Sequence, residues 1–162
     1  MSERTFFGVL TPEQASSTLW PAVSVLVAQA IHYGRGEYTL EDIHEGLRRG
    51  EMLAVAKVVD RQVEFVLTCV VAVFPRKRVL YVQYGAGRGG ADLKEKLIEV
   101  ARVLKCDWIE TRCRESVARL YRRLGFDVAY NVCILEVWDY GLSKQPIDGA
   151  GVLHASGVEA AV

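Results

Sequence analysis

Apolar residues along the chain follow two periods, one typical of strands and one typical of helices. Two long extended runs cover residues 52–59 and 63–74, and Asp60 and Arg61 between them predict a tight turn. We therefore expect an antiparallel hairpin, whose faces must both be covered because the two runs are apolar throughout. Further strand-like runs cover residues 5–10, 79–84, 107–113 and 127–138. The last of these predicts one bent strand or a pair of strands.

Helical spacing of apolar residues predicts four helical stretches. They cover residues 11–31, 39–50, 91–105 and 114–124. In the first stretch, Trp20 and Pro21 predict a kink or a break, because proline removes a backbone donor and restricts the residue before it. The second stretch begins in the style of a capping box at Thr39 and ends at Gly50.

The order of these elements limits the topology. One strand, two helices, three strands, a helix, a strand, a helix and a final strand or strand pair together predict an α/β domain. The helix over 91–105 joins the strand over 79–84 to the strand over 107–113. Because such a connection returns by a right-handed crossover, these two strands should be parallel neighbours.

Composition favours one globular domain without a strong electrostatic partner. The chain has 162 residues, of which 51% are hydrophobic, and this is enough for one substantial core, which we place at residues 1–140. Lys plus Arg and Asp plus Glu number 20 each, so no global field draws the protein to nucleic acid or to an anionic membrane. Residues 141–162 form a tail rich in glycine and alanine, and we expect a partner or a second copy of the chain to order it.

Neither a membrane span nor a metal site is expected. No apolar run reaches the roughly 20 residues that span a bilayer. The first residues, M-S-E-R-T, lack the basic and apolar parts of a signal peptide, which predicts a cytoplasmic protein. The four cysteines have no metal-binding spacing, and we expect them to be small buried hydrophobic residues. They are Cys69, Cys106, Cys113 and Cys133.

Residues 112–126, R-C-R-E-S-V-A-R-L-Y-R-R-L-G-F, carry the most specific pattern. The apolar residues lie on one helical face, and Gly125 is typical of a helix end. Residues 118–126 resemble the last conserved block of the GNAT acyltransferase superfamily, in which a tyrosine stands four residues before a Gly-Phe pair. The resemblance implies a GNAT-like mixed, mostly antiparallel central sheet with helices on both faces, over about residues 3–138. It also implies acetyl-CoA as the cofactor and Tyr121 as the acid that returns a proton to the departing thiolate. Plain packing of an amphipathic tyrosine remains the alternative.

The G-A-G-R-G-G stretch at residues 85–90 stands between a predicted strand and a predicted helix. Exposed backbone amides and the helix dipole suit phosphate oxygens at such a position. In the family the corresponding loop, Q/R-x-x-G-x-G/A, holds the pyrophosphate of coenzyme A. The resemblance therefore implies cofactor contacts at Val82, Gly85, Gly87, Arg88, Gly89 and Gly90.

The sequence departs from the family pattern at three places near this loop. Val82 and Tyr84 stand where the family has Gln or Arg, and Asp92 can cap the amides that a phosphate needs. Residues 112–115, R-C-R-E, replace an asparagine that contacts the cofactor in the family. A glycine-rich turn that serves only tight packing is the alternative.

Transfer to an amine also needs a base and donors for an oxyanion. The family commonly uses a carboxylate or a water chain as the base and a fourth-strand amide as the oxyanion donor. An amide at Val82 or Gln83 fills the second role if the strands separate as they do in the family. The candidate bases, among which the sequence does not choose, are His32, Glu37, His44, Glu64 and Glu110.

The sequence thus leaves two main functions open. The first is an acetyl-CoA-dependent N-acyltransferase that acts on an amine acceptor. The second is a GNAT-like scaffold without cofactor chemistry that serves in assembly, through its tail, with a partner or as a homo-oligomer. It resembles such domains in internal virion proteins of short-tailed phages. Nucleic-acid binding through Arg76, Lys77 and Arg78 is weaker, because a basic hairpin tip is usually a solvated turn.

Overall fold

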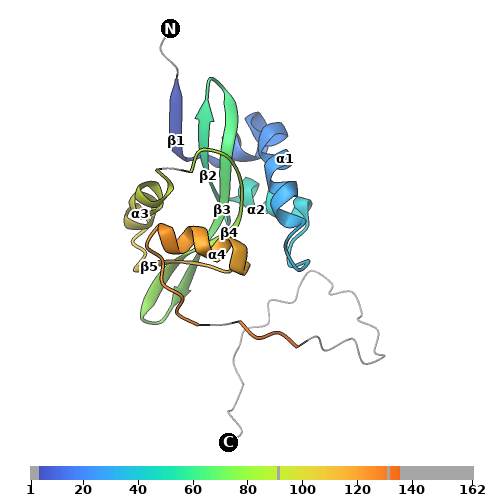
Figure 1. Ribbon diagram of the computed structural model, residues 1–162. Coiled ribbons are helices and arrows are strands. Elements are labelled where there is room, and N and C mark those ends of the chain that lie inside the picture. Colours follow the sequence, from blue (N-terminus) through green and yellow to red (C-terminus); the bar gives the residue numbers. More distant parts are fainter. Residues whose placement is uncertain (1–3, 91, 131, 136–162) are drawn as a thin grey trace, which may run out of the picture. The chain divides into compact units, whose positions relative to one another are not determined.

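The computed structural model describes residues 4–90, 92–130 and 132–135 (Figure 1). The chain divides into two compact units, Met1–Phe126 and Asp127–Val162, and every helix and strand of the described residues lies in the first. The predicted tail over 141–162 lies outside the described residues, and the domain boundary at residue 140 stays a prediction. The elements of the first unit are β1 (Thr5–Val9), η1 (Gln14–Thr18), α1 (Trp20–Ile31), α2 (Leu40–Arg49), β2 (Leu53–Val59), β3 (Gln62–Phe74), β4 (Lys77–Gly87), α3 (Leu93–Val103), β5 (Trp108–Thr111) and α4 (Glu115–Arg123).

The five strands form one sheet in the order β1-β2-β3-β4-β5. The first four strands are antiparallel neighbours, and β4 and β5 are parallel, with Val79 opposite Trp108 and Val82 opposite Thr111. This confirms the mixed, mostly antiparallel sheet and the parallel pair that the connection through α3 requires.

Each face of the sheet has its own hydrophobic cluster, because alternate strand residues point to opposite faces. Ala54, Ala56 and Val66 pack with residues of α1 and α2, whereas Val55 and Leu67 pack with residues of α3. Figure 1 shows α3 and α4 together in front of the sheet and α1 to its right. Helices on both faces are therefore confirmed.

Local signals in the sequence have the expected outcomes. Thr39 and Asp42 form the capping box of α2, in which the amide of Asp42 donates to the Thr39 hydroxyl at 3.1 Å and the amide of Thr39 donates to the Asp42 carboxylate at 2.7 Å. Gly50 ends this helix at φ 72°. Asp60 and Arg61 have φ of 46° and 69°, as a tight hairpin turn requires.

The first helical stretch is broken where proline predicts it. The π-helical turn η1 ends at Thr18, and the Leu19 amide donates to the Gln14 carbonyl at 2.8 Å. The helix α1 then begins at Trp20 with Pro21 in its first turn. Proline is tolerated there, because a backbone N–H in the first turn would have no acceptor within the helix.

β4 is longer than the sequence pattern predicts. The strand extends to Gly87, with Gly85 opposite Leu67 and Gly87 opposite Phe65. Residues 85–87 of the expected loop over 85–90 therefore belong to the strand. A Cβ at Gly85 would lie 2.4 Å from Leu67 Cδ2. Glycine therefore allows close packing within the strand here, and only residues 88–90 of the described chain form a connection before Asp92.

The predicted final strand is wrong for the described residues. Residues 127–130 and 132–135 form no strand, and the remaining residues of the run, 131 and 136–138, lie outside the described part of the chain. Val128, Val132 and Ile134 do alternate, but their side chains are exposed. An alternating pattern favours a strand only where another strand supplies the hydrogen bonds.

The four cysteines differ in burial, although the sequence predicted that all of them are buried. Cys69 is fully buried, and burial raises the pKa of its thiol to about 12. Cys106 is half-buried, whereas Cys113 and Cys133 are exposed, so the expected burial is wrong for these two. The reason at Cys113 is that β5 ends at Thr111 and leaves the cysteine in the connection to α4.

The described residues contain neither a membrane-spanning helix nor a cluster of metal ligands. No helix there is long and apolar enough to cross a membrane. Within the same residues, no three His, Cys, Asp or Glu side chains are grouped so that they could hold a metal ion.

Candidate functional site

Tyr121 lies on α4 with its ring turned toward the sheet. The ring contacts Phe126 edge to face, with 5.1 Å between centroids, and the Phe126 amide donates to the Tyr121 carbonyl at 3.1 Å. Gly125, at φ 91°, makes the turn that brings Phe126 back. Burial raises the pKa of the Tyr121 phenol above its usual value, and a hydrogen bond from the Thr111 hydroxyl acts in the opposite direction. The phenol therefore stays protonated at neutral pH.

Thr111 is also the residue at which β4 and β5 separate. The parallel pairing ends at Val82 and Thr111, whereas β4 continues beside β3 for five more residues. Because Tyr121 contacts Thr111, the phenol lies at the point of separation. The amides of Val82 and Gln83 lie at the end of this pairing and stay candidates for the oxyanion donor.

A bulge in β4 accompanies this separation. Thr68 pairs with Tyr84 and Cys69 pairs with Val82, so Gln83 is an extra residue in the strand. Its side-chain oxygen Oε1 is buried and has no hydrogen-bond partner among the described residues. A buried carbonyl oxygen without a partner is destabilising unless a bound molecule donates to it.

The connection after β4 offers part of a phosphate site. The Arg88 amide donates to the Glu64 carbonyl at 2.8 Å, which fixes the start of the connection against β3. Gly89 follows with φ of 87°, and the Arg88 side chain is exposed. Asp92 precedes α3, but its side chain makes no capping hydrogen bond, so the competition with phosphate that the sequence suggests is not observed.

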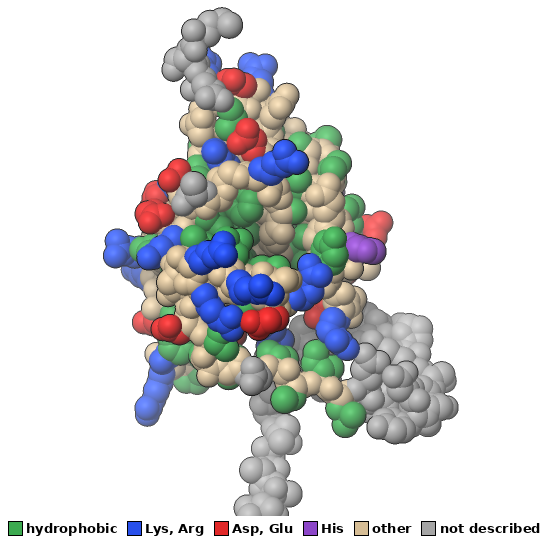
Figure 2. Space-filling view, viewed as in Figure 1, with side chains coloured by type: hydrophobic (Ala, Val, Ile, Leu, Met, Phe, Trp, Pro, Cys, Tyr) green, Lys and Arg blue, Asp and Glu red, His purple; other side chains and the backbone are tan. Residues whose placement is uncertain are grey.

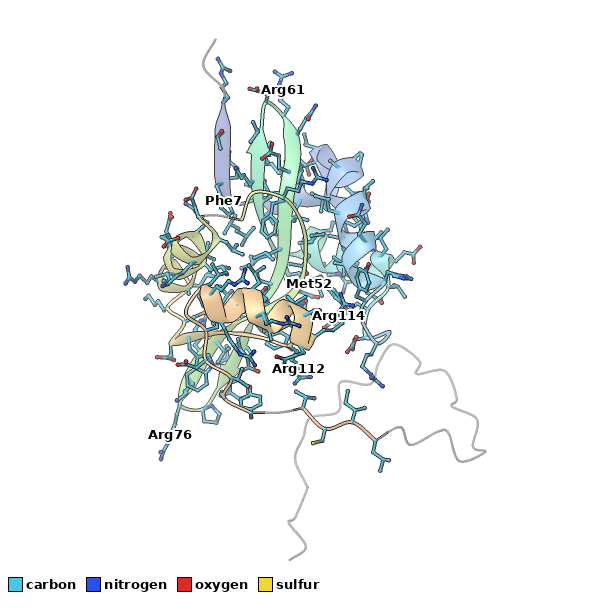
Figure 3. The ribbon with its side chains drawn as sticks, viewed as in Figure 1. Phe7, Met52, Arg61, Arg76, Arg112 and Arg114 are labelled. Atoms are coloured by element: carbon cyan, nitrogen blue, oxygen red, sulfur yellow. The ribbon has the colours of Figure 1, made fainter. Side chains whose placement is uncertain are left out.

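Basic side chains gather over α4 in the space-filling view (Figure 2). Arg112 and Arg114 stand at the start of the helix, in the position of the family's asparagine (Figure 3). The Arg114 guanidinium lies 4.2 Å from the ring centroid of Tyr33, and that of Arg112 lies 5.7 Å from the centroid of Tyr81. Both cations are thus held over aromatic rings of the first unit.

The candidate bases fall into different surroundings. His44 Nε2 lies 2.8 Å from the Ser16 carbonyl oxygen, and its ring stacks on Trp20, so this histidine has a structural role. Glu37 accepts a hydrogen bond from the Arg35 amide at 2.9 Å. His32 contacts the ring of Tyr33 edge to face.

The structure brings two of these carboxylates together around the aromatic residues of β4. Burial raises the pKa of Tyr81, the charge of Arg112 lowers it, and the charges of Glu110 and Glu37 raise it. Tyr84 feels Glu37 as well, and its ring meets that of Tyr38 edge to face with centroids 6.2 Å apart. Glu64 is separate from this group, because its carboxylate lies 3.6 Å from Lys57 Nζ.

Several residues of the site were missed by sequence reasoning. Sequence reasoning named Gln83 only for its backbone amide; its buried side-chain oxygen was missed, since it lies at a bulge that no sequence signal marks. Thr111 is significant because β5 ends there. Lys57, in contrast, carries a signal, since it is a single charge in the otherwise apolar run of β2.

Solved structures share this fold. An aminoglycoside N-acetyltransferase in complex with CoA has a TM-score of 0.63 at 12% identity, over 84% of this chain and 96% of that chain. An aminoglycoside acetyltransferase from an uncultured soil metagenomic sample has a TM-score of 0.61 at 18% identity, over 85% and 99%. A protein of Clostridium acetobutylicum described as a predicted acetyltransferase, solved with acetyl-CoA, has a TM-score of 0.61 at 14% identity, over 85% and 99%.

The chain therefore has the fold of the GNAT acetyltransferases, which confirms the resemblance noted at residues 118–126 at the level of the fold. No protein-family model matches the sequence, and no curated protein matches it either.

The residues present fit the cofactor that this fold implies. The strands separate beside a protonated phenol, and the orphan oxygen of Gln83 lies on the strand next to that point. The amide N–H groups of a pantetheine arm are donors of the kind that such an oxygen needs. The connection over 88–90, with a lysine beside it, suits the phosphate end.

Proposed function

We propose that the protein is an acetyl-CoA-dependent N-acyltransferase that acts on an amine acceptor. The observation that carries the proposal is the half-buried Tyr121 phenol beside Thr111, where the pairing of β4 and β5 ends. Acetyl-CoA, when bound, supplies the activated acetyl group. The neighbouring solved structures with CoA and acetyl-CoA support this choice of cofactor.

Tyr121 holds the proton that the reaction needs at its end. Tyr121 would donate its phenolic proton to the sulfur as the amine nitrogen bonds to the acyl carbon and the carbon–sulfur bond breaks. The proton that the amine nitrogen releases would pass to solvent, from which the phenolate would be protonated again. Because burial raises the pKa of this phenol, Tyr121 acts as an acid and not as a base. An amide N–H of Val82 or Gln83 donates to the oxygen that becomes negative during the transfer.

The acceptor amine is best accommodated near Tyr84. The charge of Glu37 raises the pKa of Tyr84, whereas the Arg112 guanidinium over the ring of Tyr81 lowers the pKa of Tyr81. A negative potential favours a cationic amine, and an aromatic face adds a second attraction for a cation.

The scaffold alternative has lost part of its support. Asp92 does not cap α3, and the tail that favoured assembly lies outside the described residues. The comparisons give no support to a virion protein. Nucleic-acid binding is weaker still, because Lys77 Nζ lies 3.8 Å from the ring centroid of Trp108 and not beside Arg76 at the hairpin tip (Figure 3).

Calorimetric titration with acetyl-CoA and thiol release in the presence of a panel of amines test the proposal directly. Tyr121→Phe should lower kcat by about 100-fold and leave the Kd for acetyl-CoA nearly unchanged, because a positioned acid acts only in the transition state. Tyr130→Phe, which removes the hydroxyl of an exposed tyrosine, is the matched control and should keep kcat.

The pH profile gives a second measure. The phenol works as an acid only while it is protonated, and its pKa is raised above the usual 10. The kcat of the wild type should therefore stay level up to about pH 10, and the alkaline fall should be absent in Tyr121→Phe. A wild-type protein that binds no CoA at millimolar concentration would leave the scaffold alternative in place.

A further inference from the structure

Lys57 occupies an unusual position in the middle of β2. Its neighbours across the sheet are Phe7 on β1 and Phe65 on β3, and it lies two residues from the fully buried Val55, on the face that α3 covers. Only 23% of its side chain is exposed. A lysine among apolar side chains is destabilising unless its ammonium group is paired.

The pairing that the chain itself provides is weak. Within the described residues, the one ion-pair partner of Lys57 is Glu64, whose Oε2 lies 3.6 Å from the lysine Nζ. This distance is longer than a hydrogen bond, and the Glu64 side chain is 42% exposed. The ammonium group therefore keeps donors for another acceptor.

The ammonium group lies directly against the connection over 88–90. A Cβ on Gly89 would be 3.1 Å from Lys57 Nζ and 3.6 Å from Glu64 Oε2, so the backbone of the connection passes over the lysine with the Glu64 carboxylate beside it. Figure 1 shows this connection crossing the sheet on its way from β4 to α3. Lys57 on β2 thus brings a positive charge to the 88–90 connection. The chain lacks the Gln or Arg that the family pattern has before its glycines.

We infer that Lys57 is the cation that binds the pyrophosphate of coenzyme A at the 88–90 connection. This inference rests on the proposed function and adds a binding residue to it. The lysine supplies a point charge and three donors, and the neighbouring connection supplies backbone amides, which together suit a phosphoanhydride. Gly89 has φ of 87°, a backbone conformation that favours glycine, and the lack of a side chain there also leaves the ammonium group open to an anion.

The test measures binding and not turnover. Lys57→Gln should weaken the binding of CoA by about 10-fold in calorimetric titration, since a charge-assisted hydrogen bond is lost, and should leave the binding of pantetheine, which has no phosphate, unchanged. Glu64→Gln is the matched control, because it removes the same ion pair and leaves the lysine. It should bind CoA at least as tightly as the wild type.

The outcomes separate this inference from the function on which it rests. If Lys57→Gln and the wild type bind CoA equally, the assignment of Lys57 is wrong and the proposed function stands. If Lys57→Gln and Glu64→Gln lose CoA affinity to the same extent, the ion pair acts as a structural unit and the assignment is also wrong. If the wild type binds no CoA, both proposals fail.

A second variant protects the test against a folding defect. Lys57→Met keeps the length of the side chain and suits the apolar neighbours, so it should fold even if Lys57→Gln does not. It should show the same loss for CoA and the same unchanged binding of pantetheine. Inorganic pyrophosphate should compete with CoA in the wild type, and an absence of competition would overturn the assignment.

Discussion

The two halves of β4 differ in their neighbours. Residues 77–82 lie between β3 and β5, and Val79, Leu80 and Val82 are almost completely buried. Residues 83–87 have β3 alone as a partner strand among the described residues, and they include the unpaired oxygen of Gln83 and the exposed Gly85. We call residues 77–82, which have a partner strand on each side, the paired half of β4. Residues 83–87, which have β3 as their partner, are the open half.

This difference teaches where the stability of the sheet lies. The paired half supplies apolar area to the cluster that α3 covers. The open half keeps a polar group without a partner and glycines without side chains, which are features that reduce stability. Local violations of this kind are expected at functional sites, where a bound molecule completes the structure.

The largest effect should follow from a change in the paired half. Leu80→Ala removes a fully buried side chain and should lower the free energy of unfolding by about 2–5 kcal/mol in urea titration. Gln83→Met in the open half should leave it unchanged or raise it by up to about 1 kcal/mol, because it removes a buried acceptor without a partner. If Leu80→Ala and Gln83→Met lowered the free energy of unfolding equally, the two halves of β4 would not differ in their contribution to stability.

A smaller effect concerns the glycine that ends the open half. A Cβ on Gly87 would lie 2.1 Å from the Glu64 carbonyl oxygen, and Gly87 has φ of 114°. Gly36 has φ of 81° and open space around it, so it is the matched control. Gly36→Ala should cost about 1 kcal/mol from backbone strain alone, and Gly87→Ala about 2–4 kcal/mol because the backbone must also move.

Thermal unfolding of these two variants decides what Gly87 does. A larger loss for Gly87→Ala means that this residue is glycine for its approach to β3. If the two variants lose the same stability and Gly87→Ala binds CoA less tightly, its role lies in the cofactor site instead.

Local physics explains which parts of this fold the sequence predicts. The capping box at Thr39, the turn at Asp60 and the break at Pro21 each depend on neighbouring residues, and all three are present. The parallel pair follows from the handedness of one connection. Tyr121 was predicted as the acid from a short block, and its position beside Thr111 supports that prediction without testing it.

Non-local relations explain what the sequence does not predict. The bulge at Gln83 depends on how β3 and β4 align, and the position of Lys57 beside Gly89 joins residues far apart in the chain. The strand expected over 127–138 had the right alternation, but alternation does not specify a partner. The sequence placed the end of this strand at residue 84, whereas β4 ends at Gly87. Glycine is typical of loops, but it also occurs within strands where another part of the backbone packs closely.

The smallest effect concerns the carboxylates at the starts of two helices. Hydrogen bonds from the Thr39 amide and hydroxyl lower the pKa of Asp42, whereas Asp92 before α3 makes no such bond. Asp42→Ala should therefore cost about 1 kcal/mol in the free energy of unfolding, and Asp92→Ala less than about 0.5 kcal/mol.

The pH dependence of Asp42→Ala sharpens the comparison. Since the pKa of Asp42 is lowered on folding, its contribution is complete above the ordinary value of 3.8 and is lost as the pH falls through the lowered pKa. The difference in thermal midpoint between the wild type and Asp42→Ala should thus shrink on acidification. A loss at Asp92 equal to that at Asp42 would show that the first amides of α3 are already capped, and the segment after β4 would then be closed to a phosphate.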